Sequence, residues 1–289
     1  MGVKLFDLIP VKEIRFEDMA GKIIVVDGNL NLYQFLSSIR QKDGTLLMDS
    51  KGNITSHLTG LFMRSARLMR YGIKLCYVFD GKAPDLKKKE QMRRRELKEE
   101  AATKYKEAEK SGDVAGMKKY ASRTTKLTPQ MVEEAKELIS ALGLPVVHAP
   151  SEGEAQAAHM VRNGHAYAVG SQDADSFLFG ATRVIKNLTI SPRKKKPGQF
   201  AYREVKPEMI ILENILNELG LDQNQLIALA MLVGTDYNPG GIKGIGPKNA
   251  LKLVKKYGAD LDALFLEVKW GETFSFNWTD VFYQIKKID

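Results

Sequence analysis

Cysteine is nearly absent from the sequence and histidine is scarce: the 289 residues include one Cys and four His. These counts exclude a disulfide framework and a cysteine-rich zinc module. The single cysteine, Cys76, lies in the apolar run of residues 75–79, where a buried core thiol is expected. The pattern is typical of a protein from a reducing, intracellular setting.

Long apolar runs are missing as well. No stretch reaches the roughly 20 residues that a membrane-spanning helix needs, and the segment from Met1 to Phe6 lacks the apolar region of a signal peptide. Phe6 also stands where a myristoylation pattern requires Ser or Thr. We therefore expect no membrane association. With 44% hydrophobic and 27% charged residues, the chain has the composition of a globular protein with a sizeable core.

Negative charge is in deficit, and the formal net charge is +9. Most of the excess lies in residues 82–126, which hold 15 Lys and Arg against 8 Asp and Glu. Such a surface favours a polyanionic partner. The segment is polar on all sides, with few apolar residues, among them Leu97, Tyr105 and scattered alanines, which is not the pattern of a core helix. It is either an arch that spans solvent or a segment that orders on its substrate.

Acidic residues, although fewer, occur in a compact pattern of two pairs, each spaced by one residue. Glu152 and Glu154 open a helix-like segment, and Asp173 and Asp175 follow a short apolar run at residues 167–170. In a βα-type fold, helix starts and strand ends share one edge of the sheet. Four crowded carboxylates repel one another unless divalent cations hold them, so the pattern predicts a metal site with oxygen ligands.

Further acids lie at the ends of predicted strands. The apolar runs at residues 22–26 and 73–79 read as buried parallel strands followed by Asp27 and Asp80. With a third strand at 144–147, the alternation of strand and helix predicts an α/β fold with a mostly parallel central sheet flanked by helices. The carboxyl edge of this sheet would gather these acids. An acidic centre beside a basic segment suits an enzyme that binds a phosphate backbone and cuts it with metal.

Each acid also has an ordinary structural interpretation. Ser151 and Glu154 match a capping box, and Asp173 and Asp175 suit Asx turns. An Asp at a strand end, such as Asp27, commonly caps the next helix. The Asp-x-Asp-Ser spacing at residues 173–176 resembles phosphatases with an aspartyl nucleophile, but in those enzymes the pair follows the first strand. Convergence of all the acids on one edge favours the shared divalent site over these alternatives.

The C-terminal half continues with strands and helices. Residues 184–189 and 200–205 are predicted as two strands of a hairpin whose tip, residues 191–198, is basic. Residues 208–219 and 223–233 are predicted as helices. Beyond residue 269 the sequence shows no organised signal.

A glycine-rich turn precedes the last predicted helix. Gly244 and Gly246 let the backbone approach a phosphate, and Pro247 suits the first helical position. The turn resembles a helix–hairpin–helix type loop, in which free amides at a helix N-terminus hold a phosphate. Its ordinary alternative is a glycine-rich helix entry, and the flanking Lys243 and Lys248 favour the phosphate loop.

These motifs, in this order, resemble the flap endonucleases of archaea and eukaryotes, which are structure-specific 5′ nucleases. The match covers residues 1 to about 258. It is carried by the following segments: Gly2, Val26-Asp27, Tyr33 to Leu36, Val78 to Gly81, Ala149 to Ala157, Gly170 to Asp175, Gly234 to Tyr237 and Gly244 to Lys248.

The resemblance implies a PIN-like 5′ nuclease fold with a helical arch and a helix–hairpin–helix type DNA-binding element. It implies 5′ flap endonuclease and 5′-3′ exonuclease activity near junctions of single- and double-stranded DNA, in replication (Okazaki fragment processing) and repair. It also implies two Mg²⁺ ions, for which Mn²⁺ can substitute, in a site of seven carboxylates. Asp80, Glu152 and Glu154 would serve one ion, with Asp27 acting through water, and Asp173, Asp175 and Asp236 the other.

Other residues receive roles from the same resemblance. Lys87 and Arg94 match a catalytic basic pair at the base of the arch, and Tyr33 matches an aromatic residue on which a base stacks. K⁺ is expected at the Gly244–Gly246 turn, beside duplex phosphates. The expected DNA-binding residues are Gly2, Tyr33, Arg40, Gly244, Ile245, Gly246 and Lys248.

We expect a single 5′ nuclease domain over residues 1–265 and a divergent or truncated tail over 266–289. The domain divides into an N-terminal nuclease region (1–81), the basic arch (82–127), an internal nuclease region (128–206) and a helix-two-turn-helix region (207–265). Two features depart from the family pattern. Gly28-Asn29 replaces an Ala and an aromatic or small residue, and the tail has no sliding-clamp motif, which leaves clamp binding open.

The expected partner is DNA with a 5′ flap, a nick or a branch, and the expected state is a monomer. The location would be cytoplasmic in an archaeon and nuclear in a eukaryote. Two alternatives remain: a sibling 5′ nuclease of exonuclease or Holliday-junction type, and a non-catalytic basic DNA-binding module. The module would need no clustered acids, since carboxylates near phosphate weaken binding.

Overall fold

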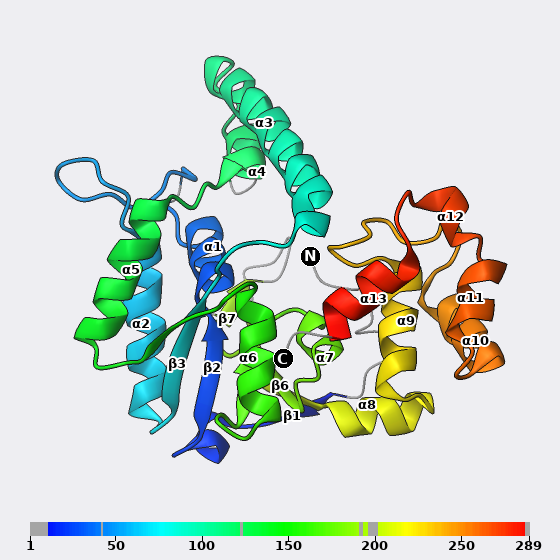
Figure 1. Ribbon diagram of the computed structural model, residues 1–289. Coiled ribbons are helices and arrows are strands. Elements are labelled where there is room, and N and C mark those ends of the chain that lie inside the picture. The colour runs from blue at the N-terminus through cyan, green and yellow to red at the C-terminus, as the bar shows by residue number, and fades with distance from the viewer. Residues whose placement is uncertain (1–10, 42, 122–123, 191–192, 196–201, 287–289) are drawn as a thin grey trace.

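A seven-stranded sheet forms the centre of the computed structural model, which describes residues 11–41, 43–121, 124–190, 193–195 and 202–286 (Figure 1). The strand order is β1-β9-β6-β5-β2-β3-β4. The strands are β1 (Lys12–Glu13), β2 (Ile23–Asp27), β3 (Lys74–Phe79), β4 (Val146–His148), β5 (Ala168–Gly170), β6 (Arg183–Lys186) and β9 (Glu208–Ile211). The strands from β6 to β4 run parallel, and β9 and β1 add antiparallel pairs at one edge. The mostly parallel α/β sheet is thus confirmed.

Helices cover both faces of the sheet because its central strands are apolar on both sides. Along β2, Val25 packs into one core cluster, whereas Ile24 and Val26 pack into the other. The cluster around Ile24 includes side chains from α1 (Gly28–Ser38), α2 (Ser56–Arg70) and α5 (Pro129–Ala141). The cluster around Val25 includes side chains from α6 (Gly153–Arg162), α7 (Asp175–Leu178) and α9 (Gln223–Val233).

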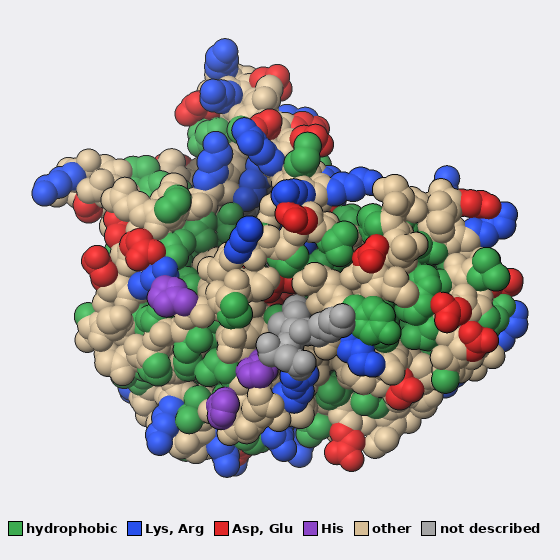
Figure 2. All heavy atoms as spheres, viewed as in Figure 1, with side chains coloured by type: hydrophobic (Ala, Val, Ile, Leu, Met, Phe, Trp, Pro, Cys, Tyr) green, Lys and Arg blue, Asp and Glu red, His purple; other side chains and the backbone are tan. Residues whose placement is uncertain are grey.

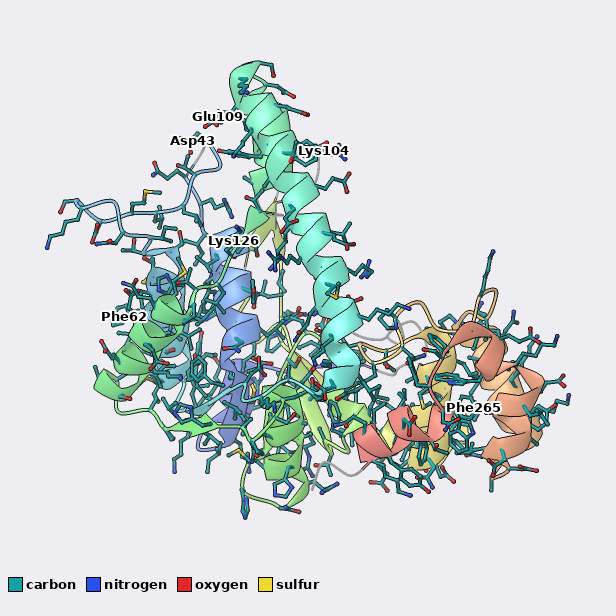
Figure 3. All side chains as sticks on the ribbon, turned by 45° about the horizontal axis from the view of Figure 1, so that its top comes forward. Asp43, Phe62, Lys104, Glu109, Lys126 and Phe265 are labelled. Atoms are coloured by element: carbon teal, nitrogen blue, oxygen red, sulfur yellow. The ribbon has the colours of Figure 1, made fainter. Side chains whose placement is uncertain are left out.

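The basic segment forms the predicted helical arch. After the 3-10 helix η3 (Asp85–Lys87), α3 (Lys88–Lys110) rises away from the sheet and α4 (Val114–Ala121) returns beside it (Figure 1). Lysines and arginines gather along this projection (Figure 2), and Lys104 and Glu109 lie on its outer part (Figure 3). Ala101 and Ala108 are buried on α3, and Gly116 of α4 approaches Ala108 so closely that an added Cβ would lie 3.0 Å from the alanine methyl group. Within the described residues, no helix has the length and apolarity to cross a bilayer.

Two predicted elements between residues 184 and 219 were wrong. Residues 208–211 are not the start of a helix but the strand β9, which pairs with β6, and the helix α8 begins only at Leu212 (Leu212–Leu219). The apolar run from Met209 to Ile211 is compatible with a helix or a strand. It forms a strand because it pairs with the edge of β6. The hairpin also has different partners: β7 (Arg193–Lys195), from the predicted tip, pairs with β8 (Tyr202–Glu204), while β6 stays in the main sheet.

The region beyond residue 246 is organised to its described end. Helices α10 (Pro247–Tyr257), α11 (Leu261–Glu267), α12 (Trp270–Thr273) and α13 (Trp278–Lys286) form a group beside α9. Phe265, labelled in Figure 3, lies in this group, with its ring stacked on Trp278 at 4.6 Å between centroids and edge-on to Trp270 at 5.2 Å. The sequence showed no organised signal here because these anchors are aromatic and their spacing follows no single period.

Candidate active site

The seven predicted acids lie at the carboxyl edge of the parallel strands or on the loops and helices next to it. Their places are as follows: Asp27 ends β2, Asp80 follows β3, Glu152 precedes α6, Glu154 lies in the first turn of α6, Asp173 follows β5, Asp175 begins α7 and Asp236 follows α9. Parallel strands bring these positions together because their carboxyl ends meet at one edge. The structure therefore gathers the acids that the sequence placed on five separate segments.

Two of these acids, the buried Asp27 and the half-buried Glu154, lie among other acids. Burial, followed by the nearby Asp80, raises the pKa of Asp27 to about 7, although its carboxylate accepts a hydrogen bond from the Leu30 amide at 2.9 Å. Burial and the charge of Asp175, followed by that of Asp173, raise the pKa of Glu154 well above its ordinary value. A carboxyl group that resists ionisation for these reasons would gain from a nearby cation.

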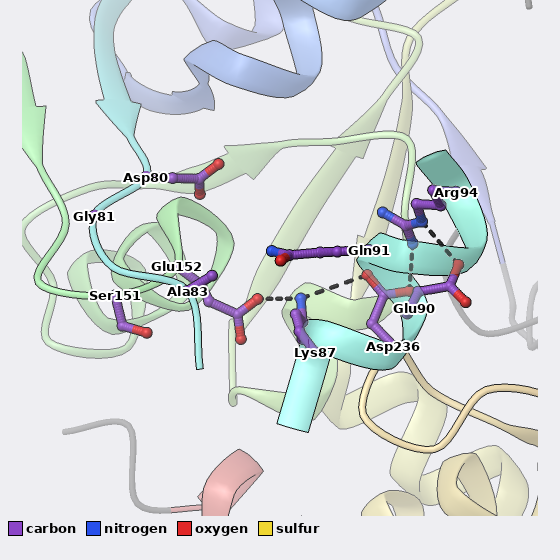
Figure 4. A pocket seen from close by; sticks show the side chains of 10 residues that line it. All are labelled: Asp80, Gly81, Ala83, Lys87, Glu90, Gln91, Arg94, Ser151, Glu152 and Asp236. Atoms are coloured by element: carbon purple, nitrogen blue, oxygen red, sulfur yellow. Dashed lines mark hydrogen bonds and ion pairs between the residues drawn. The ribbon is translucent and has the colours of Figure 1, made fainter. Parts of the chain in front are cut away.

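The other part of the cluster is balanced by cations from the arch (Figure 4). The Lys87 ammonium contacts Glu152 and lies 3.4 Å from an oxygen of Asp236. Arg94 donates to the other Asp236 oxygen at 2.6 Å and, through Nε, to Glu90 at 2.8 Å. The two cations thus join the base of the arch to the acidic edge of the sheet.

The charges on these partners shift with their surroundings. Burial opposes the charged form of Lys87, but Glu152 and Asp236 outweigh it, so the pKa of Lys87 is raised. Burial raises the pKa of Glu152, and Lys87 offsets part of that rise. The hydrogen bond from Arg93, together with Arg94, lowers the pKa of Glu90 to about 2. Lys87 and Glu90 are therefore charged at neutral pH.

A cleft with a volume of about 170 Å³ opens between the arch and the sheet (Figure 4). Asp80, Glu152 and Asp236 line it from the side of the sheet and α9. Lys87 and Arg94 line it from the arch. A phosphate in this cleft would meet cations on one wall and carboxylates, which need metal to tolerate it, on the other.

The capping-box interpretation of Ser151 and Glu154 was wrong. Glu152, not Ser151, holds the N-cap position of α6, and its side chain makes no capping hydrogen bond. The Ser151 hydroxyl instead donates to the Lys82 carbonyl at 3.2 Å, and Glu154 accepts from the Ser176 hydroxyl at 3.3 Å. Asp27 does cap α1 through the Leu30 amide, so for this residue the ordinary role and a place in the acidic cluster coexist.

Three groups near the acids escaped the sequence analysis as contributors to the site. The Asn29 side chain donates to Asp80 at 2.5 Å, and the Gly153 amide donates to the other Asp80 oxygen at 2.7 Å. The Tyr237 hydroxyl donates to Glu152. Asn29 was visible only as a departure from the family pattern, and Tyr237 reads as an ordinary core aromatic residue.

The predicted DNA-binding residues lie apart from the acids. Tyr33 on α1 is 37% exposed, and the Lys98 ammonium of the arch lies 4.6 Å from its ring centroid. Arg40 donates within the chain, to the Gly44 carbonyl and the Thr125 hydroxyl, each at 2.9 Å. The turn that holds Gly244, Ile245 and Gly246 leads into α10 with Lys248, and none of these residues lines the cleft. Gly2 is outside the described residues.

Within the described ranges, no three His, Cys, Asp or Glu side chains stand in an arrangement that could hold a metal ion. The chemistry of the donors nevertheless fits divalent cations such as Mg²⁺, which prefer carboxylate oxygen. Burial, followed by the repulsion of neighbouring acids, raises the pKa values of Asp27 and Glu154, and a bound cation would favour their charged forms. The assignment of particular acids to particular ions stays a prediction.

Comparison with known families and sequences identifies relatives over most of the chain. The XPG N-terminal domain matches residues 1–101, and the XPG I-region matches residues 143–236. The chain is 57% identical to flap endonuclease 1 of Pyrococcus abyssi over 265 residues, which is 92% of this chain and 77% of that protein. It covers 75% of flap endonuclease 1 of Staphylothermus marinus at 54% identity, over 89% of its own length.

Solved structures share the fold. Flap endonuclease-1 from Methanococcus jannaschii superposes with a TM-score of 0.75 at 43% identity, over 99% of this chain and 84% of that one. The catalytic core of Rad2 in complex with DNA substrate gives a TM-score of 0.70 at 27% identity, over 99% and 86%. With its acids gathered at the carboxyl edge of this sheet, the chain belongs to the flap endonuclease 1 family of XPG nucleases, structure-specific 5′ nucleases that depend on divalent metal.

Proposed function

We propose that this chain hydrolyses phosphodiester bonds in DNA with a 5′ flap, near the junction of single- and double-stranded DNA, and that it also acts as a 5′-3′ exonuclease in replication and repair. One observation carries the proposal: buried acids that repel one another share an edge with cations from a basic arch. The solved Rad2 core, which binds DNA substrate, supports DNA as the partner.

The acids would hold two divalent ions, Mg²⁺ or Mn²⁺. When bound, such ions supply an activated water and stabilise the leaving oxygen. The proposed ligands are Asp27, Asp80, Glu152, Glu154, Asp173, Asp175 and Asp236. Among neighbouring charges, those of Asp175 and Asp173 raise the pKa of Glu154 most, whereas those of Asp80 and Asp236 raise the pKa of Glu152. Each glutamate thus belongs with a different set of aspartates.

The cations of the arch would bind the scissile phosphate. Lys87 and Arg94 are held in the cleft by Glu152 and Asp236, so both are already oriented before DNA arrives, and Lys87 is also largely buried. Preoriented cations of this kind stabilise negative charge that develops during cleavage. Tyr33 would stack with a base at the foot of the arch, and its partner Lys98 supplies a further positive charge there.

The glycine turn before α10 would hold the duplex. Gly244 has φ +83°, a conformation that favours glycine, and a Cβ built at Gly246 would meet nothing within 4 Å, so a phosphate can approach. Lys248 lies in the first turn of α10, and K⁺ is proposed at this turn. We further propose one nuclease domain over residues 1–265, a monomeric state and an intracellular location, with clamp binding undecided.

Cleavage of a labelled flap substrate, with products mapped to the nucleotide, tests the proposal. We expect products cut near the junction in Mg²⁺ and uncut DNA in EDTA. An Asp175→Asn variant should bind the flap as the wild type does but cleave it roughly a thousandfold more slowly, because it loses part of a metal site worth several kcal/mol. Retained cleavage by this variant would remove the two-ion assignment. Uncut DNA with the wild type in Mg²⁺ would instead leave a DNA-binding module.

A further inference from the structure

Tyr237 is 3% exposed and contacts two residues that line the cleft, the acid Glu152 and the cation Lys87. Its hydroxyl donates to one oxygen of Glu152, while Lys87 contacts the other oxygen of the same carboxylate. The Lys87 ammonium also lies 5.1 Å from the centroid of the Tyr237 ring. Tyrosine, carboxylate and ammonium therefore form a closed triangle in which each group contacts the other two.

The backbone around Tyr237 is fixed by buried hydrogen bonds. The Tyr237 amide donates to the Thr235 hydroxyl at 3.2 Å, and that hydroxyl donates to the side-chain oxygen of Asn238 at 2.6 Å. Asn238, which is fully buried, donates in turn to the Met231 carbonyl of α9 at 2.7 Å. The turn after α9 thus holds Tyr237 in place without help from the arch.

A close backbone contact fixes the same turn from the other side. Gly241 has φ +57°, and a Cβ on it would lie 2.4 Å from the Leu232 carbonyl oxygen, so the chain at residues 240–242 packs directly on the end of α9. The Ile242 amide donates to that carbonyl at 2.9 Å. Such a turn is a rigid base from which a side chain can orient its neighbours.

We propose that Tyr237 is a positioning residue of the cleavage site: its hydroxyl fixes the orientation of Glu152, and its ring face holds the Lys87 ammonium over the cleft. The proposal rests on the proposed roles of Glu152 as a metal ligand and Lys87 as a phosphate-binding cation. Hydrogen bonds to a ligating carboxylate commonly decide its orientation and the metal affinity of the site. An ammonium over an aromatic face is held by the ring quadrupole while its N–H groups stay available to other acceptors.

Two substitutions separate the two contacts. Tyr237→Phe keeps the ring beneath Lys87 and removes the hydroxyl from Glu152. Tyr237→Leu removes both contacts. Tyr77→Phe is the matched control, because Tyr77 is also buried and its hydroxyl lies 2.9 Å from that of Ser65, in the core cluster on the other face of the sheet.

Metal binding is measured directly by the electron paramagnetic resonance signal of free Mn²⁺, and cleavage of a labelled flap is titrated with Mg²⁺. For Tyr237→Phe we expect both affinities to fall about 10- to 100-fold, the usual cost of losing a group that orients a ligand. Its rate at saturating metal should stay near that of the wild type. Tyr237→Leu should also lose roughly tenfold in rate at saturating metal, since Lys87 loses its ring contact. DNA affinity in EDTA should change little in Tyr237→Phe.

The outcome separates this proposal from the proposed function. If the wild type binds Mn²⁺ and cuts the flap, but Tyr237→Phe titrates like the wild type or like Tyr77→Phe, Tyr237 has only a structural role and the inference is wrong. A fall in melting temperature without a change in either titration would likewise show a purely structural role. If the wild type itself neither binds Mn²⁺ nor cuts, the proposed function fails first. Tyr237→Phe alone carries the test if Tyr237→Leu does not fold.

Discussion

The carboxylate cluster has two parts that differ in how their charge is balanced. The balanced part consists of Glu152 and Asp236, which lie against Lys87 and Arg94, cations that the chain itself supplies from the arch. The acid-rich part consists of Asp27, Glu154, Asp173 and Asp175. Here the charges of the three aspartates shift the pKa of Glu154 more than the charge of Lys87 does. The charge of the first part is therefore balanced by cations of the arch, whereas at Glu154 the repulsion from neighbouring acids outweighs the attraction of Lys87.

The difference explains how one cleft can serve both metal and phosphate. The arch carries the groups that neutralise the balanced part, so its base is anchored to the sheet even though most of α3 lies in solvent. The acid-rich part lies at the ends of β2 and β5 and at the start of α6, where the sheet fixes its geometry. Without metal, removing an acid from the acid-rich part should therefore raise the free energy of unfolding. Removing a cation that neutralises the balanced part should lower it.

The largest effect is expected from the acid-rich part. Glu154→Gln should reduce Mg²⁺-dependent cleavage roughly a thousandfold, because it removes a proposed ligand. In EDTA at about pH 8 the same variant should be more stable than the wild type by on the order of 1 kcal/mol, because the wild type must either hold this charge beside other acids or take up a proton on folding. Chemical denaturation and flap cleavage measure the two effects. Glu133→Gln, at an exposed position on α5, should change neither, and a destabilised Glu154→Gln protein would break the comparison.

The balanced part should behave in the opposite way. Lys87→Ala leaves Glu152 without its cationic partner and leaves Asp236 with Arg94 alone, at 2.6 Å, and in EDTA it should cost on the order of 2 kcal/mol in unfolding free energy. Cleavage should fall about 10²- to 10³-fold, as when a group that stabilises developing charge is removed. Lys88→Ala is the control, since the side chain of Lys88 is 72% exposed and forms an ion pair with the exposed Asp85. Equal effects of the two substitutions would show that Lys87 is an ordinary surface lysine.

The acid-rich part should also make stability depend on pH. The pKa of Asp27 rises from 3.8 to about 7 on folding, so the stability that its protonated form contributes is fully present below 3.8 and is lost as pH rises through about 7. In EDTA, unfolding free energy should therefore fall by on the order of 2 kcal/mol between about pH 5.5 and about pH 8. Asp27→Asn should flatten this dependence. Saturating Mg²⁺ should restore stability most at the higher pH, and a wild-type protein that is equally stable at both pH values would contradict the assignment.

The parts of the fold that were predictable are those in which local sequence and tertiary context agree. Central parallel strands such as β2 and β3 are buried on both faces, so they read as continuous apolar runs, and the residues that follow them fall at one edge by topology alone. The strand β9 could not be recognised, because a short apolar run becomes a strand only when an open sheet edge lies next to it. The ring contacts of Trp270 with Phe265 and Phe274 could not be recognised either, because the spacing of these aromatic residues follows no regular period.

The site was predictable to a different degree. Its acids could be named because crowded carboxylates have few structural uses, and the family resemblance gave their roles. The ion pairs that balance the charge of these acids could not be predicted. The contact of Lys87 with Glu152 spans 65 residues of chain, and that of Arg94 with Asp236 spans 142. Both contacts arise only when the base of the arch meets the sheet. Tyr237 was missed because a buried tyrosine beside an acid has no sequence signature of its own.

The smallest effect is expected at Glu90, an acid that belongs to neither part of the cluster. Its carboxylate holds Arg93 at 2.7 Å and Arg94 at 2.8 Å, and both guanidinium groups are more than a third exposed. Glu90→Gln should therefore cost only about 0.5 kcal/mol at neutral pH, in the range of partly exposed pairs. It should leave the Mg²⁺ titration unchanged, because Arg94 keeps its bond to Asp236.

The effect of Glu90→Gln should also depend on pH. Folding lowers the pKa of Glu90 to about 2, so the stability that its carboxylate contributes is present above about pH 4.5 and is lost as pH falls. Wild type and variant should therefore have similar stability in acid. A changed Mg²⁺ titration would show that Glu90 acts on the metal ligands, and the separation between the cluster and the arch would then be wrong.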